Sequence, residues 1–396
     1  MPTHVLDNAT LWIGDGKSFD GHVVVDGRTI EAVEHGRYAG PLPVTDLAGL
    51  SLSPGMIDLM TLGGFGMSIL RDDQIDLGRA YLKLGVTSLQ VCMGTLQPDR
   101  LKQLAANTCR AQAYKGTDAA RVLSLYLEGP FQEPRLTGGS LRELAQPPTP
   151  DNVSRVLEDC GGALRMINVS PGVEHDTDAI ARFVAAGVTV TMAHSDAPAD
   201  HVAACLEAGT SQLGHVWDNN SALIGDSGVQ QPTIDHVALV DERVRFMHML
   251  CDGTHVHTVM MKIVLRCRGL EAVCLVTDGN QRMGCEDGEF EWDDGRIMTK
   301  AKGVCRTPEG WLAGSATALP DMFRHFVKVT GTQPQQAIAA VTANPAAAIG
   351  LADQIGRLSP GLTADLIAWD DQLRVRRIWR AGEPCNDVSD FQEIYL

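Results

Sequence analysis

Three side chains that bind metals in other proteins follow three separate apolar runs of the sequence. Glu128 ends the string Leu-Tyr-Leu-Glu, His194 follows Val-Thr-Met-Ala, and His215 follows Leu-Gly. One carboxylate and two imidazoles form a three-ligand zinc set that leaves the fourth position open for water or substrate. Asp278 follows a further run, Val-Cys-Leu-Val-Thr, where a proton-transfer base would be wanted. The pattern predicts metal-assisted hydrolysis.

Eight apolar, strand-like runs recur through the middle of the chain, and helix-like stretches separate most of them. Alternating strands and helices predict a parallel sheet, and eight repeats predict a (β/α)8 TIM-like barrel of the α/β class. Functional residues of that fold gather at the carboxyl ends of the strands, where the four side chains above fall. The runs are residues 52–59, 86–91, 122–127, 164–169, 188–192, 211–213, 244–250 and 272–276, and the clearest helices are residues 99–114, 177–186, 201–208, 321–330 and 334–341.

The two ends of the chain have a different pattern from the middle. Residues 1–51 and 349–396 both show short strands separated by turn signals, which predicts a β-rich unit. We expect these two ends to pair into one small β-sandwich domain beside a barrel of residues 52–348. The segment at about 284–311 is rich in glycine and acidic residues, and it predicts a β-hairpin insertion after the last barrel strand.

Composition limits the partners of this chain of 396 residues. Its formal net charge is -16, and no block of lysine or arginine appears. Nucleic acids and anionic membranes need clustered cations, so neither is expected as a partner. We also expect no signal peptide and no membrane span. The ten cysteines are scattered without a Cys-x-x-Cys pair, which predicts reduced thiols in a cytoplasmic protein.

Nine strings, in order over nearly the whole chain, give the sequence a family resemblance. It resembles the amidohydrolase superfamily and, within it, is similar to the N-acetylglucosamine-6-phosphate deacetylase family. The resemblance implies hydrolysis of the acetamide of an N-acetylated amino sugar to acetate and the amino sugar. The strings are Ser-Pro-Gly-Met-Ile-Asp (53–58), Leu-Glu-Gly-Pro-Phe (127–131), Ala-His-Ser (193–195), Gly-His (214–215), Cys-Asp-Gly-Thr-His-Val-His (251–257), Leu-Val-Thr-Asp (275–278), Leu-Ala-Gly-Ser (312–315), Asn-Pro-Ala (344–346) and the tail at 356–366.

The resemblance also implies a role for each matching position. Glu128, His194 and His215 would hold one divalent metal ion, expected to be Zn²⁺, and Asp278 would be the general base and then the general acid. His255 would lie near the scissile carbonyl oxygen and the sugar. The family is expected to be homodimeric. The remaining substrate contacts are expected from Asp218, Asn219, Leu312, Ala313 and Gly314, whereas Asp252 is interpreted as a turn residue and His257 receives no assigned role.

The sequence departs from the family in its metal ligands. Many superfamily members carry His-x-His after the first barrel strand, but Met60 and Leu62 stand at those positions here. Neither is a useful zinc ligand, so we expect a single metal ion. The resemblance implies that the deacetylase branch includes such one-metal members.

A second departure concerns the phosphate of the family's substrate. An arginine eleven residues after the last metal histidine is replaced by Asp226, and a histidine a dozen residues past the family's glutamate is replaced by Ser140. An aspartate would repel a phosphate dianion. Either other cations such as Arg135 and Arg282 hold the phosphate, or the substrate carries none, and the sequence favours an altered substrate preference.

Two other functions remain open from the sequence. One is a different amidohydrolase reaction on the same scaffold, such as hydrolysis of an N-acyl amino acid or a cyclic amide. The other is a non-catalytic barrel relative that has lost its metal, as the missing His-x-His would suggest. Against the second stands the presence of every residue that a one-metal mechanism needs.

Overall fold

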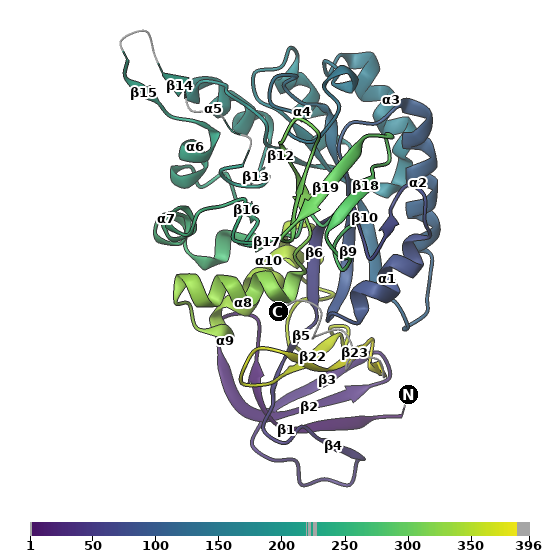
Figure 1. Cartoon of the computed structure of the whole chain (residues 1–396). Helices are drawn as coiled ribbons and strands as arrows, with labels where there is room; N and C mark the ends of the chain where they lie inside the picture. The colour runs from purple at the N-terminus through teal and green to yellow at the C-terminus, as the bar shows by residue number, and fades with distance from the viewer. Residues whose placement is uncertain (1, 219, 221–222, 225–227, 386–396) are drawn as a thin grey trace.

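The protein consists of a barrel of alternating strands and helices beside a smaller sheet built from the two ends of the chain (Figure 1). The computed structural model describes residues 2–218, 220, 223–224 and 228–385. None of the helices in these described ranges is long and apolar enough to cross a bilayer.

The barrel contains eight parallel strands in the order β17-β16-β13-β12-β11-β10-β9-β6, which confirms the predicted fold. Each of the eight apolar runs contributes one strand to the barrel. A single bridge, not a full ladder, joins the first strand to the segment after the last one, where Thr61 pairs with Gly279. The carbonyl oxygen of Gly279 also accepts a hydrogen bond from the nitrogen of Leu62 at 2.8 Å. The strands are β6 (Met56–Thr61), β9 (Val86–Met93), β10 (Arg121–Phe131), β11 (Leu164–Val169), β12 (Thr189–Met192), β13 (Gln212–Leu213), β16 (Phe246–Met249) and β17 (Val273–Leu275).

Helices cover the outside of the barrel (Figure 1). Their ends follow ordinary capping chemistry: α3 begins with Pro150 after Thr149, whose side chain accepts from the nitrogen of Asn152, and α8 ends at Gly331 with φ 76°. The helices are α1 (Gln74–Leu82), α2 (Pro98–Gln112), α3 (Pro150–Cys160), α4 (Asp176–Ala185), α5 (Ala199–Ala208), α6 (Ile234–Val240), α7 (Thr258–Arg268), α8 (Leu319–Thr330), α9 (Pro334–Ala337) and α10 (Ala343–Ala348), with 3-10 turns at Arg142–Leu144, Gly161–Ala163, Leu270–Ala272 and Ile338–Val341.

The two ends of the chain pair as expected, although the sandwich is made from one sheet that folds over its own apolar core. Its order is β24-β23-β22-β5-β1-β2-β3, with β4 beside β1, and Leu52 of β5 pairs with Ala368 of β22. The strands are β1 (His4–Trp12), β2 (Ser18–Asp26), β3 (Thr29–His35), β4 (Val44–Asp46), β5 (Ser51–Pro54), β22 (Leu366–Trp369), β23 (Val375–Arg380) and β24 (Glu383–Cys385).

The strand expected at residues 52–59 is in fact two strands that belong to different sheets. β5 joins the terminal sheet and β6 opens the barrel, with Gly55 between them. A Cβ atom at Gly55 would lie 2.1 Å from Oγ1 of Thr87, so only glycine allows this close crossing. The change from one sheet to the other therefore lies at Gly55, rather than after residue 51.

The insertion expected at 284–311 is larger than a hairpin. It is an antiparallel meander of four strands, β18 (Gly288–Glu291), β19 (Ile297–Ala301), β20 (Val304–Arg306) and β21 (Leu312–Ser315). Ser315 forms a parallel bridge with Gly279, so the meander is attached directly after Asp278 at the carboxyl end of the barrel. Two short pairs complete the described strands: β7 (Gly63–Gly64) with β8 (Met67–Ser68), and β14 (Leu223–Ile224) with β15 (Gln230–Gln231).

Candidate active site

The structure brings the three predicted metal ligands together. Oε1 of Glu128 lies 3.0 Å from Nε2 of His194 and 2.8 Å from Nε2 of His215, and the two Nε2 atoms are 3.0 Å apart. All three side chains are almost fully buried. Glu128 was expected at the end of its strand, but β10 continues past it to Phe131. Three donor atoms of the types that zinc prefers thus converge on one point.

The other ring nitrogens show how this donor set is oriented. Nδ1 of His194 lies 2.6 Å from the carbonyl oxygen of Leu136, and Nδ1 of His215 lies 3.1 Å from that of Asp218. A carbonyl only accepts, so each Nδ1 carries the proton and each Nε2 presents a lone pair. Two lone pairs and a carboxylate facing one another need a cation between them, which fits a divalent metal.

The electrostatics of the site without a metal lead to the same conclusion. Burial lowers the pKa of His215, but its hydrogen bond to Glu128 and the charge of that carboxylate raise it to about 10. Burial raises the pKa of Glu128, yet the two histidines together bring it well below its ordinary value. A positive charge is therefore favoured at this point, and a proton would take the place of an absent metal ion.

The backbone is strained at three site residues. His194, His215 and Asp278 have φ angles of 52°, 26° and 48°, in the left-handed region that residues other than glycine seldom adopt. Two of them directly follow short apolar strands, and the conformation turns the side chains across the carboxyl end of the barrel. Strain of this kind persists only where surrounding structure holds it, and it commonly marks a functional site.

Asp278 lies beside the predicted substrate-binding strand β21. Its carbonyl accepts from the nitrogen of Ser315 at 2.8 Å, and Gly314, with φ 63°, packs against it. A Cβ atom at Gly314 would lie 2.6 Å from the carbonyl oxygen of Asp278, so the close approach requires glycine. Burial and the nearby charge of Glu128 raise the pKa of Asp278 well above its ordinary value.

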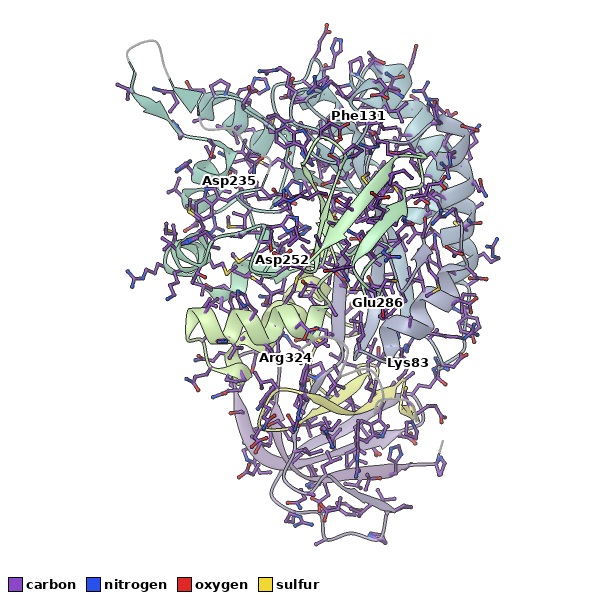
Figure 2. All side chains as sticks on the ribbon, in the orientation of Figure 1. Lys83, Phe131, Asp235, Asp252, Glu286 and Arg324 are labelled. Atoms are coloured by element: carbon purple, nitrogen blue, oxygen red, sulfur yellow. The ribbon has the colours of Figure 1, made fainter. Side chains whose placement is uncertain are left out.

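His255 is oriented by Asp252, whose sequence context predicts only a turn residue. Oδ2 of Asp252 lies 2.6 Å from Nδ1 of His255 and accepts from Oγ of Ser315 at 2.9 Å. Oδ1 accepts from the nitrogens of Thr254 and His255, so Asp252 also forms the expected turn. The side chain of Asp252, labelled in Figure 2, is almost fully buried and follows β16 in the sequence. Because Nδ1 is engaged, Nε2 of His255 is left to face the cavity.

His257 has a different environment from His255. It precedes α7, and its Nδ1 accepts from the nitrogen of Val259 as a helix cap. The residue is exposed and does not line the cavity. Its observed contact is that of a helix cap.

A cavity of about 330 Å³ contains every predicted site residue that the structure describes. Asn219 and Asp226 lie outside the described residues. Arg135 and Arg282, the cations considered for a phosphate, are not among the lining residues, since Arg135 pairs with Glu133 and Asp196 and Arg282 donates to the carbonyl of Glu286. The predicted residues in the cavity wall are Glu128, His194, His215, Asp218, His255, Asp278, Leu312, Ala313 and Gly314.

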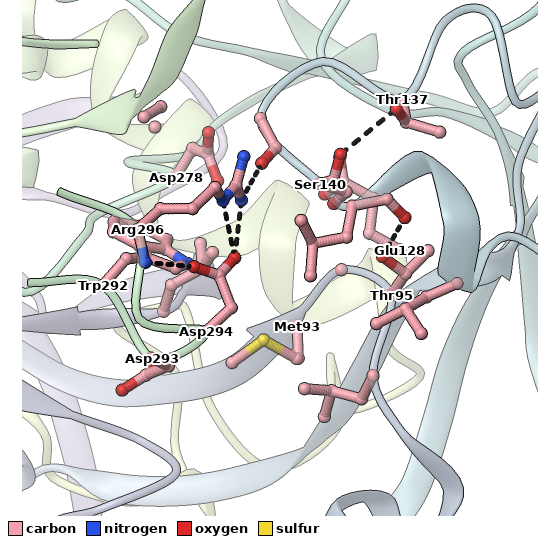
Figure 3. Close-up of a pocket in the computed structure, with 18 of the residues that line it drawn as sticks. Met93, Thr95, Glu128, Thr137, Ser140, Asp278, Trp292, Asp293, Asp294 and Arg296 are labelled. Carbon is pink, nitrogen blue, oxygen red and sulfur yellow. Dashed lines mark hydrogen bonds and ion pairs between the residues drawn. The ribbon is translucent and has the colours of Figure 1, made fainter. Parts of the chain in front are cut away.

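Further residues line the cavity beside the predicted set, and most of them were not anticipated from the sequence. Ser140 lines the cavity at the position that the family resemblance singled out. Arg100 and Arg296 are in the wall as well, together with Trp292, Asp293 and Asp294 (Figure 3). The turn signal Asp-Asp-Gly at residues 293–295 was visible in the sequence, but nothing in the pattern indicated which surface the turn would face.

Met60 and Leu62 occupy the places where a second metal site would need ligands. Met60 is fully buried in an apolar cluster with Leu59 and Tyr126, and Leu62 lines the cavity. In the described part of the chain, the residues whose donor atoms converge at this cavity are Glu128, His194 and His215.

Comparison with known sequences finds similar proteins. Residues 233–393 match the model described as "Amidohydrolase family". The chain is 28% identical to N-acetylgalactosamine-6-phosphate deacetylase of Escherichia coli O157:H7, over 96% of this chain and 99% of the relative. It is also 28% identical to N-acetylglucosamine-6-phosphate deacetylase of Vibrio furnissii, over 93% and 92% of the two chains.

Solved structures extend the similarity to the whole fold. A mutant of N-acetyl-D-glucosamine-6-phosphate deacetylase from Mycobacterium smegmatis, in complex with N-acetyl-D-glucosamine-6-phosphate, superposes with a TM-score of 0.88 at 25% identity, over 97% of this chain and 99% of that one. The enzyme from Pasteurella multocida has the same fold, with a TM-score of 0.88 at 24% identity, over 97% and 99% of the chains. In its barrel, its convergent candidate ligands and these full-length matches, the chain is similar to members of the amidohydrolase family.

Proposed function

We propose that this protein is a metal-dependent deacetylase that hydrolyses the acetamide of an N-acetylated amino sugar, giving acetate and the amino sugar. The observation that carries the proposal is the meeting of Glu128, His194 and His215 with Asp278 and His255 in one cavity. Matched relatives that share this length and fold are named as deacetylases of N-acetylated hexosamine phosphates. An amide needs an activated carbonyl and a protonated leaving group, and the cavity offers groups for both.

The three ligands would hold one divalent ion, expected to be Zn²⁺, which when bound supplies Lewis acidity toward the carbonyl and acidifies a nearby water. Asp278 accepts the proton of the water that adds to the acetyl carbon. Burial lowers the pKa of His255, but the hydrogen bond to Asp252 and the charge of that carboxylate raise it above its ordinary value, which favours the imidazolium with both ring nitrogens protonated. Nδ1 then donates to Asp252, and Nε2 donates to the carbonyl oxygen as negative charge develops there, a contribution of about 3 kcal/mol. Asp278 then returns its proton to the departing amine nitrogen, so that a neutral amine leaves.

We further propose a cytoplasmic homodimer with a single metal ion per chain. The ten cysteines are all free thiols, which suits a reducing compartment. The dimer rests on the family resemblance, and the single ion rests on the apolar side chains of Met60 and Leu62.

Release of acetate and a primary amine would be measured with metal-loaded protein. The substrates are N-acetylglucosamine, N-acetylgalactosamine and their 6-phosphates, with N-acetyl amino acids and a cyclic amide as controls for other amidohydrolase reactions. Acetate release from any of the sugars supports the proposal. Hydrolysis of the controls alone would assign a different reaction to the site, and complete inactivity would favour a non-catalytic barrel.

A further inference from the structure

We propose that Asp235 is a positioning residue for the metal ligand His215. The inference rests on the metal site of the proposed function and deepens it, because it names a residue that keeps one ligand in place. Asp235, labelled in Figure 2, lies in the first turn of α6 and is not among the described residues that line the cavity. It acts through the segment that follows His215 and not by touching metal or substrate.

Asp235 is a buried carboxylate whose partners in the described part of the chain are all uncharged donors. Its Oδ1 accepts from the nitrogen of Trp217 at 2.7 Å and from Nδ2 of Asn220 at 3.1 Å, and Thr233 donates to Oδ2 at 3.4 Å. The residue is fully buried, and burial raises its pKa although these bonds oppose the rise. The carboxylate therefore depends on its donors, and the loss of either bond to Oδ1 is costly.

The two donors to Oδ1 flank Asp218, whose backbone holds the ring of His215. The carbonyl oxygen of Asp218 lies 3.1 Å from Nδ1 of His215, and its nitrogen donates to the carbonyl oxygen of His215 at 3.0 Å. His215 and Trp217 have φ angles of 26° and 58°, conformations that persist only where surrounding contacts hold them. The bond from the nitrogen of Trp217 to Asp235 is such a contact.

The helix start that carries Asp235 is itself well held. Thr233 and His236 form a capping box, in which each side chain accepts from the other residue's backbone nitrogen. The ring of His236 also lies edge-on to the indole of Trp217, with the ring centroids 6.5 Å apart. The first turn of α6 thus contacts Trp217 through both its carboxylate and its imidazole, so the anchor of the segment belongs to a regular element.

These contacts form one path from α6 to the metal site. Asp235 holds the nitrogen of Trp217, and the turn at Trp217 sets the carbonyl oxygen of Asp218. That carbonyl orients the ring of His215, whose Nε2 lies 2.8 Å from Oε1 of Glu128. Removing a group that orients a metal ligand through its second nitrogen lowers metal affinity about tenfold to a hundredfold. Asp235 lies one step further from the metal, so an effect at the lower end follows.

Two substitutions of Asp235 separate hydrogen bonding from charge. Asp235→Ala removes both bonds to Oδ1, and the Kd for zinc should rise about tenfold. Asp235→Asn keeps an amide oxygen that accepts from Trp217 and Asn220, so its Kd should stay within about twofold of the wild type. If Asp235→Asn weakens zinc binding as much as Asp235→Ala, the carboxylate acts through its charge, and the inference is wrong.

Asp321→Ala is the matched control. Asp321 lies in the first turn of α8, is mostly buried, pairs with Arg324 and is not among the described residues of the cavity wall. Both alanine variants should lower the melting temperature of the metal-free protein, but Asp235→Ala alone should weaken zinc binding. Equal changes in the Kd for zinc would show that Asp235 supports the fold in general, and would contradict the inference.

Zinc affinity is measured on the full metal-free chain by competition with a chromophoric chelator, and thermal unfolding of the same samples shows that each variant is folded. Asn220→Ala decides the matter if Asp235→Ala does not fold. It removes one of the two bonds to Oδ1 from a partly exposed residue, and the Kd for zinc should rise about threefold. In that case an unchanged Kd in Asn220→Ala overturns the inference.

Zinc affinity does not depend on acetate release, so the two proposals fail separately. Wild-type zinc affinity in a folded Asp235→Ala protein overturns the inference and leaves the proposed deacetylation standing. Zinc-loaded wild-type protein that hydrolyses none of the sugars removes the proposed function and leaves the role of Asp235 standing. A wild-type chain that binds no zinc removes both.

Discussion

Thr277 donates its hydroxyl hydrogen to Oδ2 of Asp58 at 2.5 Å, while the same hydroxyl oxygen accepts from the nitrogen of Gly279 at 3.0 Å. Asp58 is fully buried in β6, the first barrel strand, and its Oδ1 also accepts from the nitrogen of Thr277, which follows the last strand. One carboxylate thus holds both neighbours of Asp278 at the seam where the barrel closes. We infer that Asp58 is a positioning residue for Asp278.

The seam should control turnover more than stability. Thr277→Val removes the hydroxyl that links Asp58 to Gly279, and small displacements of a catalytic group are costly, so kcat should fall about tenfold or more with KM little changed. Thr61→Val is the matched control, because Thr61 donates to the same Oδ2 at 3.1 Å from Asp58's own strand. Both variants should lose about 1–2 kcal/mol of stability. If Thr277→Val and Thr61→Val lose kcat equally, the hydrogen bonds of Asp58 stabilise the fold without positioning Asp278.

Asp58 should also make stability depend on pH. Burial raises its pKa to about 6, although hydrogen bonds from Thr277, Met60 and Thr61 oppose the rise. The folded chain then holds a proton that the unfolded chain releases near pH 4. The resulting stabilisation is present at low pH and is lost as pH rises through 6. Between pH 4.5 and 7.5 the wild type should lose about 2 kcal/mol relative to Asp58→Asn.

Denaturant unfolding of the two metal-free proteins across this range measures the difference. Histidines and other carboxylates titrate in both proteins, so their contributions cancel in the comparison. If the wild type loses no stability relative to Asp58→Asn as pH rises, or gains stability relative to it, Asp58 is ionised throughout this range.

Metal content should follow the predicted ligands. Purified protein loaded with Zn²⁺ should hold one ion per chain, and His215→Asn should hold almost none, because three donors are needed for tight binding. His201→Asn is the control: His201 lies 2.5 Å from Asp176 in a second cluster with Cys205. In this cluster the carboxylate of Asp176 already accepts hydrogen bonds from the backbone nitrogens of Gly172 and Thr177. Two ions in the wild type, falling to one in His201→Asn, would show that this second cluster is a metal site.

The two histidines after β16 should separate into a catalytic and a structural residue. His255→Ala removes the donor held by Asp252, and kcat should fall about a hundredfold or more. His257→Ala removes the cap of α7 and should cost about 1 kcal/mol of stability with kcat unchanged. Steady-state kinetics and thermal unfolding of both variants give the comparison. A larger loss of kcat in His257→Ala would reverse the assignment.

Local sequence patterns predict the barrel and the meeting of its three candidate metal ligands because both follow from short-range rules. Apolar runs make buried parallel strands, and Glu128 near the end of β10 meets His194 and His215, which follow β12 and β13, at one edge of the barrel. The break at Gly55 was missed because the crossing depends on Thr87, which is distant in sequence. The roles of Asp252 and Asp58 were missed for the same reason, since their partners Ser315 and Thr277 come from elsewhere in the chain.

The sequence pattern also did not predict that the meander forms part of the cavity wall. Trp292, Asp294 and Arg296 belong to a polar, glycine-containing turn that has no periodicity to indicate a buried face. Their position depends on the attachment of Ser315 to Gly279 and on the bond from Arg296 to Gly139. Such contacts form only once the barrel and the meander have packed together.

The central claim is that Asp278 transfers the protons of acetamide hydrolysis beside a metal held by Glu128, His194 and His215. The most direct measurement is kcat for acetate release by Asp278→Asn, with metal content determined on the same sample. The account predicts one metal ion per chain, a sugar KM near that of the wild type, and a loss of about a hundredfold or more in kcat. A metal-loaded Asp278→Asn protein that turns over at the wild-type rate would contradict it.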